Sequence, residues 1–415
     1  MSLLIRNARV LSMGKARPKR GPAMRDLGII KHADVIIHRD KIVAVGESLS
    51  MPSGARTIEA NGRVLCPAFV DCHTHACWAG ERLGEWERRL AGESYLALLK
   101  SGGGIMSTVR AVREASQEQL MLGLLGRLNL MLACGTMTAE VKSGYGLSTD
   151  DELKMLKAIR DADEHWAGTV IPTALLGHAL DPEDPGLVER TIMEILPAIH
   201  EEFPTIAIDA YCEQGAWTLE QTVELMRTAK AMGHPIRIHT DQFNSLGMLK
   251  EAITLGALSV DHLEAAEAAD LEALAKTGTY AVALPACGFH LDGRYTPLRE
   301  YVDAGGLACI ASNYNPGSAP CGSMPLVVAL AVRQCGLTPA EAIVAATVNP
   351  AAMLGLTDRG AIQPGQRADL LLLRGKDERE LAYEFGTPGI RLLVCGGEPI
   401  SPAEIGRPAN RQGMG

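Results

Sequence analysis

The stretch IRIHTDQFNSLGMLKEAITLGALSVDHLE, from Ile236 to Glu264, contains the unit that most of this chain repeats. Two strand-like runs, IRIHT and SVDH, flank the helix-like segment LGMLKEAITLG. A strand, a helix and a second strand at this spacing form a βαβ unit, in which the two strands run parallel. The stretch therefore predicts a parallel sheet with helices packed against it.

The same alternation continues on both sides of this stretch. Strand-like runs precede helix-like segments in TMTAEVKS and TDDELKMLKAIRDADEH, in TVIPTALL and LVERTIMEILPAIHEEF, in AIDAYCE and TLEQTVELMRTAKAMG, and in LACIASN and SMPLVVALAVRQCG. Roughly seven or eight such units predict a closed (β/α)8 barrel of the TIM type. A doubly wound open sheet is the alternative.

Both ends of the chain instead resemble short strands separated by polar turns. Apolar and polar positions roughly alternate in LLIRNARVLSM, ADVIIHRDKIVAVG and RTIEANGRVLCPAF, and strand texture returns after Gly360 in AIQPGQRADLLLLR and GIRLLVCGGEPI. We therefore expect residues 1–64 and 362–415 to form one small β-sandwich domain. Residues 65–361 would form the barrel.

Composition limits the kinds of partner. The 415 residues are 47% hydrophobic, which suffices for a sizeable core, and the formal net charge is −9. No apolar run is long enough to span a membrane, and MSLLIRNARV lacks the features of a signal peptide, so we expect a soluble cytoplasmic protein. The acidic net charge argues against nucleic acid as a partner.

Ten cysteines without a CxxC pair predict reduced thiols.

Histidines follow the ends of three predicted strands. FVDCHTHACWAG contains His73 and His75, IRIHTD contains His239, and SVDHLE contains His262. Residues two apart on a strand face the same way, and all strands of a barrel end at one rim, so these histidines can meet. Several histidines with an acid and an open water position form a hydrolytic metal site, for which zinc or iron is suitable. The alternative is that they only cap the strands.

The remaining histidines fall into two groups. One group lies in turn, helix or surface contexts, and we interpret its members as structural: His32, His38, His165, His200, His234 and His290. His178 differs because it again follows a strand, in TALLGHALDPED. From the residues alone it is either a loop residue or part of a site.

Six motifs carry a resemblance to a known family. They are CPAFVDCHTHACWAGER, LKSGGGIMSTVRAVREAS, EVKSGYGLSTDDELKML, IHTDQFNSLG, VDHLE and NPGS, and the resemblance covers about residues 60 to 360. In order and spacing they resemble the imidazolonepropionases of the amidohydrolase superfamily. HxH alone indicates only the superfamily, whereas GGGIxSTVRAxREAS and EVKSGYGL are far more specific.

The resemblance implies a reaction and a metal ion. In the family, one metal ion is bound at positions that correspond here to His73, His75, His239 and Asn313, and it activates a water molecule. The substrate is the cyclic amide 4-imidazolone-5-propanoate, and hydrolysis gives N-formimidoyl-L-glutamate in histidine degradation. The resemblance implies no organic cofactor.

The resemblance also implies substrate-binding residues. Arg82 corresponds to the arginine that holds the propionate, because a guanidinium grips a carboxylate with two hydrogen bonds. Without the resemblance, we would interpret Arg82 as a solvent-exposed charge beside Glu81 and Glu85. The other implied substrate contacts are Tyr95, Tyr145, His178, Asn315, Gly317 and Ser318. Three catalytic positions are implied. Gln242 would interact with the ring of the substrate, and His262 would act as an electrophilic or proton-handling group beside the metal-bound water. Asn313 is the third position.

At Asn313 the chain departs from the family, which has aspartate there. The amide keeps a carbonyl oxygen for a metal but cannot take a proton from water. Three explanations remain: an engineered replacement, a natural homologue that uses another base such as His262 or Asp241, or a relative that binds without catalysis.

Two other readings of the function stay open. The chain could be a divergent amidohydrolase that acts on another cyclic amide, amidine or N-acyl amino acid, or a non-catalytic ligand-binding protein. A homodimer is a further expectation, which rests only on the fold class.

Overall fold

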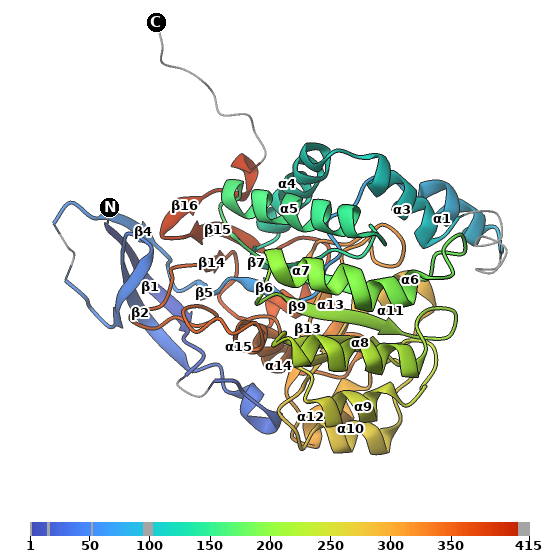
Figure 1. Ribbon diagram of the computed structural model, residues 1–415. Coiled ribbons are helices and arrows are strands. Elements are labelled where there is room, and N and C mark those ends of the chain that lie inside the picture. The colour runs from blue at the N-terminus through green and yellow to red at the C-terminus, as the bar shows by residue number, and fades with distance from the viewer. Residues whose placement is uncertain (1, 15–16, 51–52, 94–102, 406–415) are drawn as a thin grey trace, which may run out of the picture.

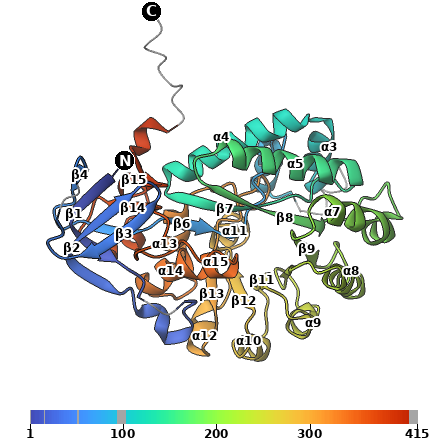
Figure 2. The same cartoon turned by 60° about the vertical axis from the view of Figure 1, so that its left-hand side comes forward.

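The computed structural model describes residues 2–14, 17–50, 53–93 and 103–405. Eight parallel strands form one sheet in the chain order β6 to β13, and helices lie outside this ring of strands (Figures 1 and 2). The strands are β6 (Phe69–Asp71), β7 (Thr136–Lys142), β8 (Thr169–Gly177), β9 (Ala207–Cys212), β10 (Ile236–Thr240), β11 (Ser259–His262), β12 (Tyr280–Ala283) and β13 (Ala308–Ile310). The predicted (β/α)8 barrel is confirmed, and the open doubly wound sheet is excluded.

Contacts just beyond β6 and β13 bring the first and last strands of the barrel together. Thr74 and Tyr314 form a parallel bridge, and the backbone N–H of His75 donates to the carbonyl of Tyr314 at 3.0 Å. The N–H of Asn313 donates to the carbonyl of His73, also at 3.0 Å. The ring therefore closes through the two segments that carry three of the four predicted metal ligands, His73, His75 and Asn313.

The helices of the first half of the barrel are α1 (Leu83–Leu90), α3 (Ile105–Glu114), α4 (Gln117–Ala133), α5 (Thr149–His165), α6 (Leu187–Arg190), α7 (Leu196–Glu202) and α8 (Leu219–Ala231). Those of the second half are α9 (Met248–Leu255), α10 (Ala268–Leu274), α11 (Pro285–Leu291), α12 (Leu298–Asp303), α13 (Met324–Gln334), α14 (Pro339–Ala345) and α15 (Val348–Met353). Ser116, Thr218 and Thr338 begin α4, α8 and α14 with capping boxes. In the described chain, no helix combines the length and apolarity needed to cross a membrane.

Segments from both ends of the chain form the second sheet, on the left of Figure 1. Its strands are β1 (Ser2–Leu11), β2 (Ile29–His38), β3 (Lys41–Gly46), β4 (Arg56–Glu59), β5 (Val64–Pro67), β14 (Leu370–Leu373), β15 (Ile390–Cys395) and β16 (Glu398–Ile400). The terminal segments also contain the short helical elements η1 (Gly21–Arg25), α16 (Glu380–Tyr383) and η3 (Pro402–Glu404), whereas η2 (Thr191–Ile195) lies between α6 and α7 of the barrel. The strands belong to a single sheet that branches at β1, which pairs with β2, β4 and β5.

Strand β14 joins the two parts of the molecule. Leu370 and Leu372 pack in the core of the small sheet, whereas Leu371 and Leu373 pack in the core of the barrel. Successive side chains of a strand point to opposite faces, so a run of four leucines is suited to burial on both sides.

The ten cysteines are all free, as their spacing predicts.

Glu341 stabilises the junction between α14, α12 and η1. Its carboxylate accepts hydrogen bonds from Arg299 at 2.7 Å, from Arg25 at 2.9 Å and from the N–H of Thr338 at 2.7 Å. Burial alone would raise its pKa, but these donors outweigh burial and lower the pKa to about 2. Because the folded-state pKa lies below the ordinary value of 4.5, the charge stabilises the fold above pH 4.5, and this stabilisation is lost as the pH falls toward 2.

We predict that Glu341→Gln lowers the free energy of unfolding at pH 7 by about 1–3 kcal/mol. Glutamine keeps the size of the side chain and the capping box but removes the charge that Arg25 and Arg299 share. Chemical denaturation at several pH values would show the difference from wild type shrinking between pH 4.5 and 2. The control is Glu300→Gln on the exposed face of α12, with an expected change within about 0.5 kcal/mol. A constant difference across this pH range would contradict the assignment.

Candidate active site and metal centre

Three histidines meet at the rim formed by the carboxyl ends of the barrel strands. His239 is on β10, whereas β6 ends at Asp71, so His73 and His75 lie just beyond the last residue of that strand. One ring nitrogen from each of the three lies within 4.8 Å of the other two. The Nε2 atoms of His75 and His239 are 3.3 Å apart. The structure thus brings the predicted histidine ligands together.

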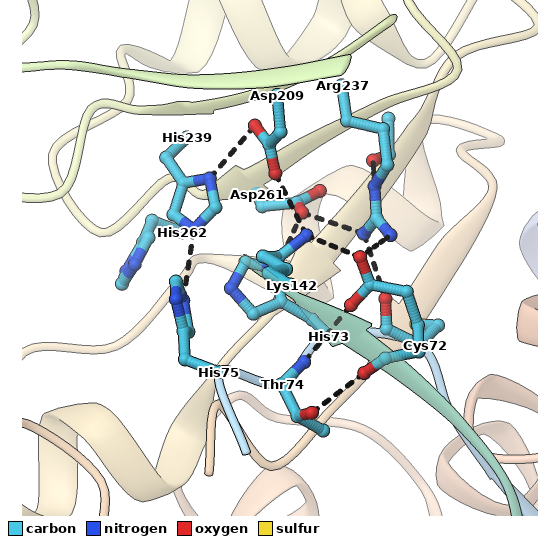
Figure 3. Close-up of polar contacts among 12 residues, drawn as sticks. Cys72, His73, Thr74, His75, Lys142, Asp209, Arg237, His239, Asp261 and His262 are labelled. Atoms are coloured by element: carbon cyan, nitrogen blue, oxygen red, sulfur yellow. Dashed lines mark hydrogen bonds and ion pairs between the residues drawn. The ribbon is translucent and has the colours of Figure 1, made fainter. Parts of the chain in front are cut away.

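Two buried aspartates orient the rings of His73 and His239. The Nδ1–H of His73 donates to Asp261 at 2.6 Å, and the Nδ1–H of His239 donates to Asp209 at 3.1 Å (Figure 3). Each aspartate fixes the tautomer in which Nε2 carries the lone pair. Carboxylate partners of this kind position histidine ligands and increase their basicity.

A network of buried charges lies beneath the histidines (Figure 3). Lys142 contacts Glu140 and Asp209, both at 2.8 Å, and Arg237 contacts Glu140 at 3.0 Å and Asp261 at 2.8 Å. Burial works against the charge on Arg237, but these carboxylates outweigh it and raise its pKa. With all five side chains ionised, three carboxylates face two cations, and the net charge of −1 favours a cation above them.

The site fits a metal ion. Burial, with nearby positive groups, lowers the pKa of His73 and His75 well below the ordinary value, and burial also lowers that of His239. The three rings are therefore neutral, which is the form that ligates metals. Within the described chain, Nε2 of His73 is buried without a hydrogen-bond partner, and the Nε2 atoms of His75 and His239 lie 3.3 Å apart. A cation would satisfy all three.

Asn313 lies just beyond β13, next to the segment that carries His73. Its side chain is buried, and Oδ1 has no hydrogen-bond partner within the described chain. Its backbone has φ of 55°, a left-handed conformation that asparagine and aspartate adopt more readily than most residues. The amide oxygen is therefore available as an acceptor, and its role as a fourth metal ligand stays a prediction.

His262 and Gln242 lie beside the histidine cluster. The ring of His262 is 5.6 Å from that of His239, between centroids, and its φ of 85° places it in a strained backbone region. The side-chain oxygen of Gln242 accepts a hydrogen bond from the Tyr211 hydroxyl at 2.8 Å, and its amide contacts the sulfur of Cys287 at 3.5 Å. Both predicted positions therefore belong to the same rim.

His178 and Tyr145 form the opposite side of the rim. His178 stacks on His75 at 5.0 Å and donates from Nδ1 to the carbonyl of Gly144 at 2.9 Å. Burial lowers the pKa of His178 to about 3, so the ring is neutral. The Tyr145 ring lies 5.0 Å from that of His178 and 6.2 Å from that of His75. His178 is therefore part of the candidate site and not an isolated loop residue.

Arg82 and the NPGS loop lie together. A β-carbon added to Gly317 would lie 3.1 Å from Nη1 of Arg82, so glycine permits the approach. Arg82 is mostly buried and pairs with Glu85 at 2.6 Å rather than extending into solvent. The side chain of Asn315 bonds within the loop, to Ser318, to the N–H of Gly317 and to the carbonyl of Asn313. Asn315 thus shapes the loop, and its contact with substrate stays a prediction.

Several residues of the site were not found from the sequence. Asp209, Asp261 and Lys142 orient the histidines, while Tyr211 and Cys287 contact Gln242. Asp261 directly precedes His262 in VDHLE, and Lys142 is in EVKSGYGL, so both were visible in motifs already quoted. Tyr211 and Cys287 had no such signal. Tyr95 lies outside the described residues.

Five of the remaining histidines make contacts outside the rim. His200 and His234 contact each other at 3.0 Å, and His38 contacts Ser2 in the small sheet. His32 contacts Asn7, and His165 contacts the carbonyl of Asp161.

The barrel and its rim of histidines define an amidohydrolase, and the chain belongs to the amidohydrolase family, whose sequence signature matches residues 64–400. Within this family it groups with the imidazolonepropionases. It is 42% identical to imidazolonepropionase of Deinococcus radiodurans over 94% of this chain and 97% of the relative. It is 40% identical to imidazolonepropionase of Herpetosiphon aurantiacus over 96% of each chain.

Solved structures share the fold at lower identity. An atrazine chlorohydrolase from Arthrobacter aurescens in complex with zinc has a TM-score of 0.67 at 20% identity, over 99% of this chain and 97% of that one. An N-isopropylammelide isopropylaminohydrolase from Burkholderia multivorans has a TM-score of 0.69 at 20% identity, over 96% and 98%. At this identity the likeness supports the fold alone.

We predict that Asp261→Asn weakens metal binding about 10- to 100-fold, because His73 loses the carboxylate that orients its ring. Dialysis of the purified protein against buffered metal, followed by metal analysis, gives the dissociation constant. The matched control is Asp241→Asn, since Asp241 is buried nearby but bonds to Thr240 and Ser245 and not to a histidine. Thermal unfolding identifies a variant that is merely misfolded. Equal affinity in a folded Asp261→Asn variant would contradict this role.

Proposed function

We propose that the chain hydrolyses 4-imidazolone-5-propanoate to N-formimidoyl-L-glutamate. The observation that carries this proposal is the meeting of three neutral histidines with Arg82 and the NPGS loop at one rim, in a chain about 40% identical to imidazolonepropionases. In the reaction, water adds to the ring carbonyl and the bond from that carbon to the ring nitrogen breaks. The carbon becomes a carboxylate that stays attached to the rest of the product, and the nitrogen takes up a proton and remains in the formimidoyl group.

His73, His75 and His239 would hold one metal ion, and the oxygen of Asn313 could complete the set. When bound, the ion would polarise the ring carbonyl and make a water molecule more acidic. Imidazole and amide oxygen suit either zinc or iron, so the ligands support both. Asp209 and Asp261 would keep the three rings oriented during turnover.

Because Asn313 cannot accept a proton, another group has to take the proton from the attacking water. The amide of Asn313 accepts hydrogen bonds but is not basic. His262 is the best-placed substitute, because it lies among the site histidines. Asp241 is less suitable, since its two oxygens already accept from Thr240 and Ser245.

Arg82 would bind the propionate. The guanidinium lies next to Gly317 of the NPGS loop and is held by Glu85, whose other oxygen accepts from Ser107 and the N–H of Gly104. Glu85 occupies the Nε and Nη2 side of the guanidinium, so Nη1 and the second N–H of Nη2 would remain for the propionate. Gln242 and His178 would contact the ring of the substrate from two sides.

Ligand binding without catalysis is a second candidate function, and Asn313 is the one observation that favours it. A divergent amidohydrolase acting on a substrate without a carboxylate would not need Arg82. A cytoplasmic location is also part of the proposal, and the ten unpaired thiols are compatible with a reducing compartment.

We predict that Asn313→Asp raises kcat on 4-imidazolone-5-propanoate by a factor on the order of 10² to 10⁴, because aspartate supplies a base at this position. Loss of substrate absorbance measures the rate, and metal analysis shows that both proteins are loaded. Asn313→Ala is the control, which should gain nothing. If Asn313→Asp carries metal and remains inactive, the substrate assignment is wrong and ligand binding becomes the better account.

We predict that Arg82→Lys, made in the more active background, raises KM about 10- to 100-fold with little change in kcat, since a bidentate contact becomes a single one. Steady-state kinetics separates the two parameters. A ring analogue without the propionate should be hydrolysed equally well by both proteins. If the variant also lost activity on that analogue, Arg82 would serve the structure of the site and not the carboxylate.

A further inference from the structure

Beside the three-histidine site lies a second group of metal-ligating side chains, formed by His262, Glu264 and Cys287. His262 ends β11, Glu264 follows two residues later, and Cys287 is in the first turn of α11. One ligand atom from each lies within 4.8 Å of the others. All three side chains are shielded from solvent, since His262 and Glu264 are only 4% and 5% exposed and Cys287 is buried.

The carboxylate of Glu264 is incompletely satisfied. Oε1 contacts Nδ1 of His262 at 3.2 Å, but Oε2 is buried without a hydrogen-bond partner in the described chain. A buried carboxylate oxygen without a partner is costly. It lines a small hollow with Cys287, Gln242, Phe243 and Arg294. The guanidinium of Arg294 is already paired with Asp292 at 2.6 Å, so it leaves the oxygen of Glu264 unsatisfied.

This group shares no ligand with the three-histidine site. The rings of His262 and His239 are 5.6 Å apart between centroids, so two ions could occupy neighbouring positions. The ligand types also differ, because the first site offers imidazoles and an amide whereas the second offers a thiol and a carboxylate. Thiolate with imidazole is a soft donor set that favours Zn²⁺ or Cd²⁺ over Mg²⁺ or Ca²⁺.

We propose that His262, Glu264 and Cys287 form a second cation site, which takes a thiophilic divalent metal ion. The thiol of Cys287 gives up its proton to solvent as the ion binds, and the thiolate and the carboxylate together neutralise the two positive charges. The imidazole of His262 is the third ligand. A water molecule from the hollow would complete a tetrahedral set.

Occupation of this site would inhibit the enzyme, a consequence that rests on the proposed function. His262 is the group that we assign to the proton of the attacking water, and an ion on its ring removes that capacity. Excess zinc should therefore inhibit the hydrolysis, even though zinc bound at the three-histidine site supports it.

The test is a titration of the zinc-loaded protein with Cd²⁺ alone. The wild-type chain should gain one tightly bound cadmium per chain and show the ultraviolet charge-transfer absorption of a cadmium–thiolate bond. Cys287→Ala should lose both. Cys66→Ala is the matched control, because Cys66 is an equally buried thiol in the small sheet and should leave binding and absorption unchanged. Glu264→Gln keeps the thiol and should weaken cadmium binding at least about tenfold.

Two results would overturn the proposal. The first is that the Cys287→Ala variant binds cadmium as tightly as wild type and shows the same absorption band. The other is an absorption band in wild type that appears only as zinc leaves the three-histidine site, which would make Cys287 a ligand of that first ion.

An activity assay separates the site from its consequence. Inhibition by excess Zn²⁺ in wild type, but not in Cys287→Ala, supports the inhibitory role. If cadmium binds at Cys287 and activity is unaffected, the inhibitory role is wrong while the site stands. If no preparation hydrolyses the imidazolone, the proposed function fails, and the cadmium titration still decides whether the site exists.

Discussion

The arrangement of the rim depends on a buried ion network made by Lys142, Arg237, Glu140, Asp209 and Asp261. Removing such charges from water costs several kcal/mol for each ion, and only close, well-oriented partners recover it. The network is therefore a weak source of stability, but it fixes geometry. Two of its carboxylates hold the Nδ1 atoms of His73 and His239, so the histidines can present only their Nε2 atoms to the centre of the rim.

The network also explains why the rim suits a cation. Burial keeps His73, His75 and His239 neutral, and the carboxylates beneath them exceed the cations by one negative charge. A metal ion would restore the balance of charge and fill the unpaired nitrogens at the same time. The barrel contributes by closing at this point, where the N–H of Asn313 bonds to the carbonyl of His73, so that the first and last strands position ligands for one site.

Asn313 and Cys287 give this rim features that the resemblance to imidazolonepropionases does not imply. An amide replaces the carboxylate that could accept a proton, and a thiol lies near a carboxylate with an unsatisfied oxygen. The Cys287 thiol lies beside the side chains of both Asn313 and Gln242, so the two departures are neighbours in the rim.

The sequence by itself determined the alternating strands and helices, hence the barrel, and the histidines that end its strands. These features follow local rules, because periodicity sets the element and strand ends share one rim. It did not determine that β6 stops at Asp71, that Asn315 bonds within its own loop, or that Tyr211 and Cys287 reach Gln242. Those contacts join residues far apart in the chain, and no local spacing encodes them. Only the tertiary structure decided which nitrogen of His73 and of His239 faces the site, because carboxylates on other strands occupy the opposite nitrogen of each ring.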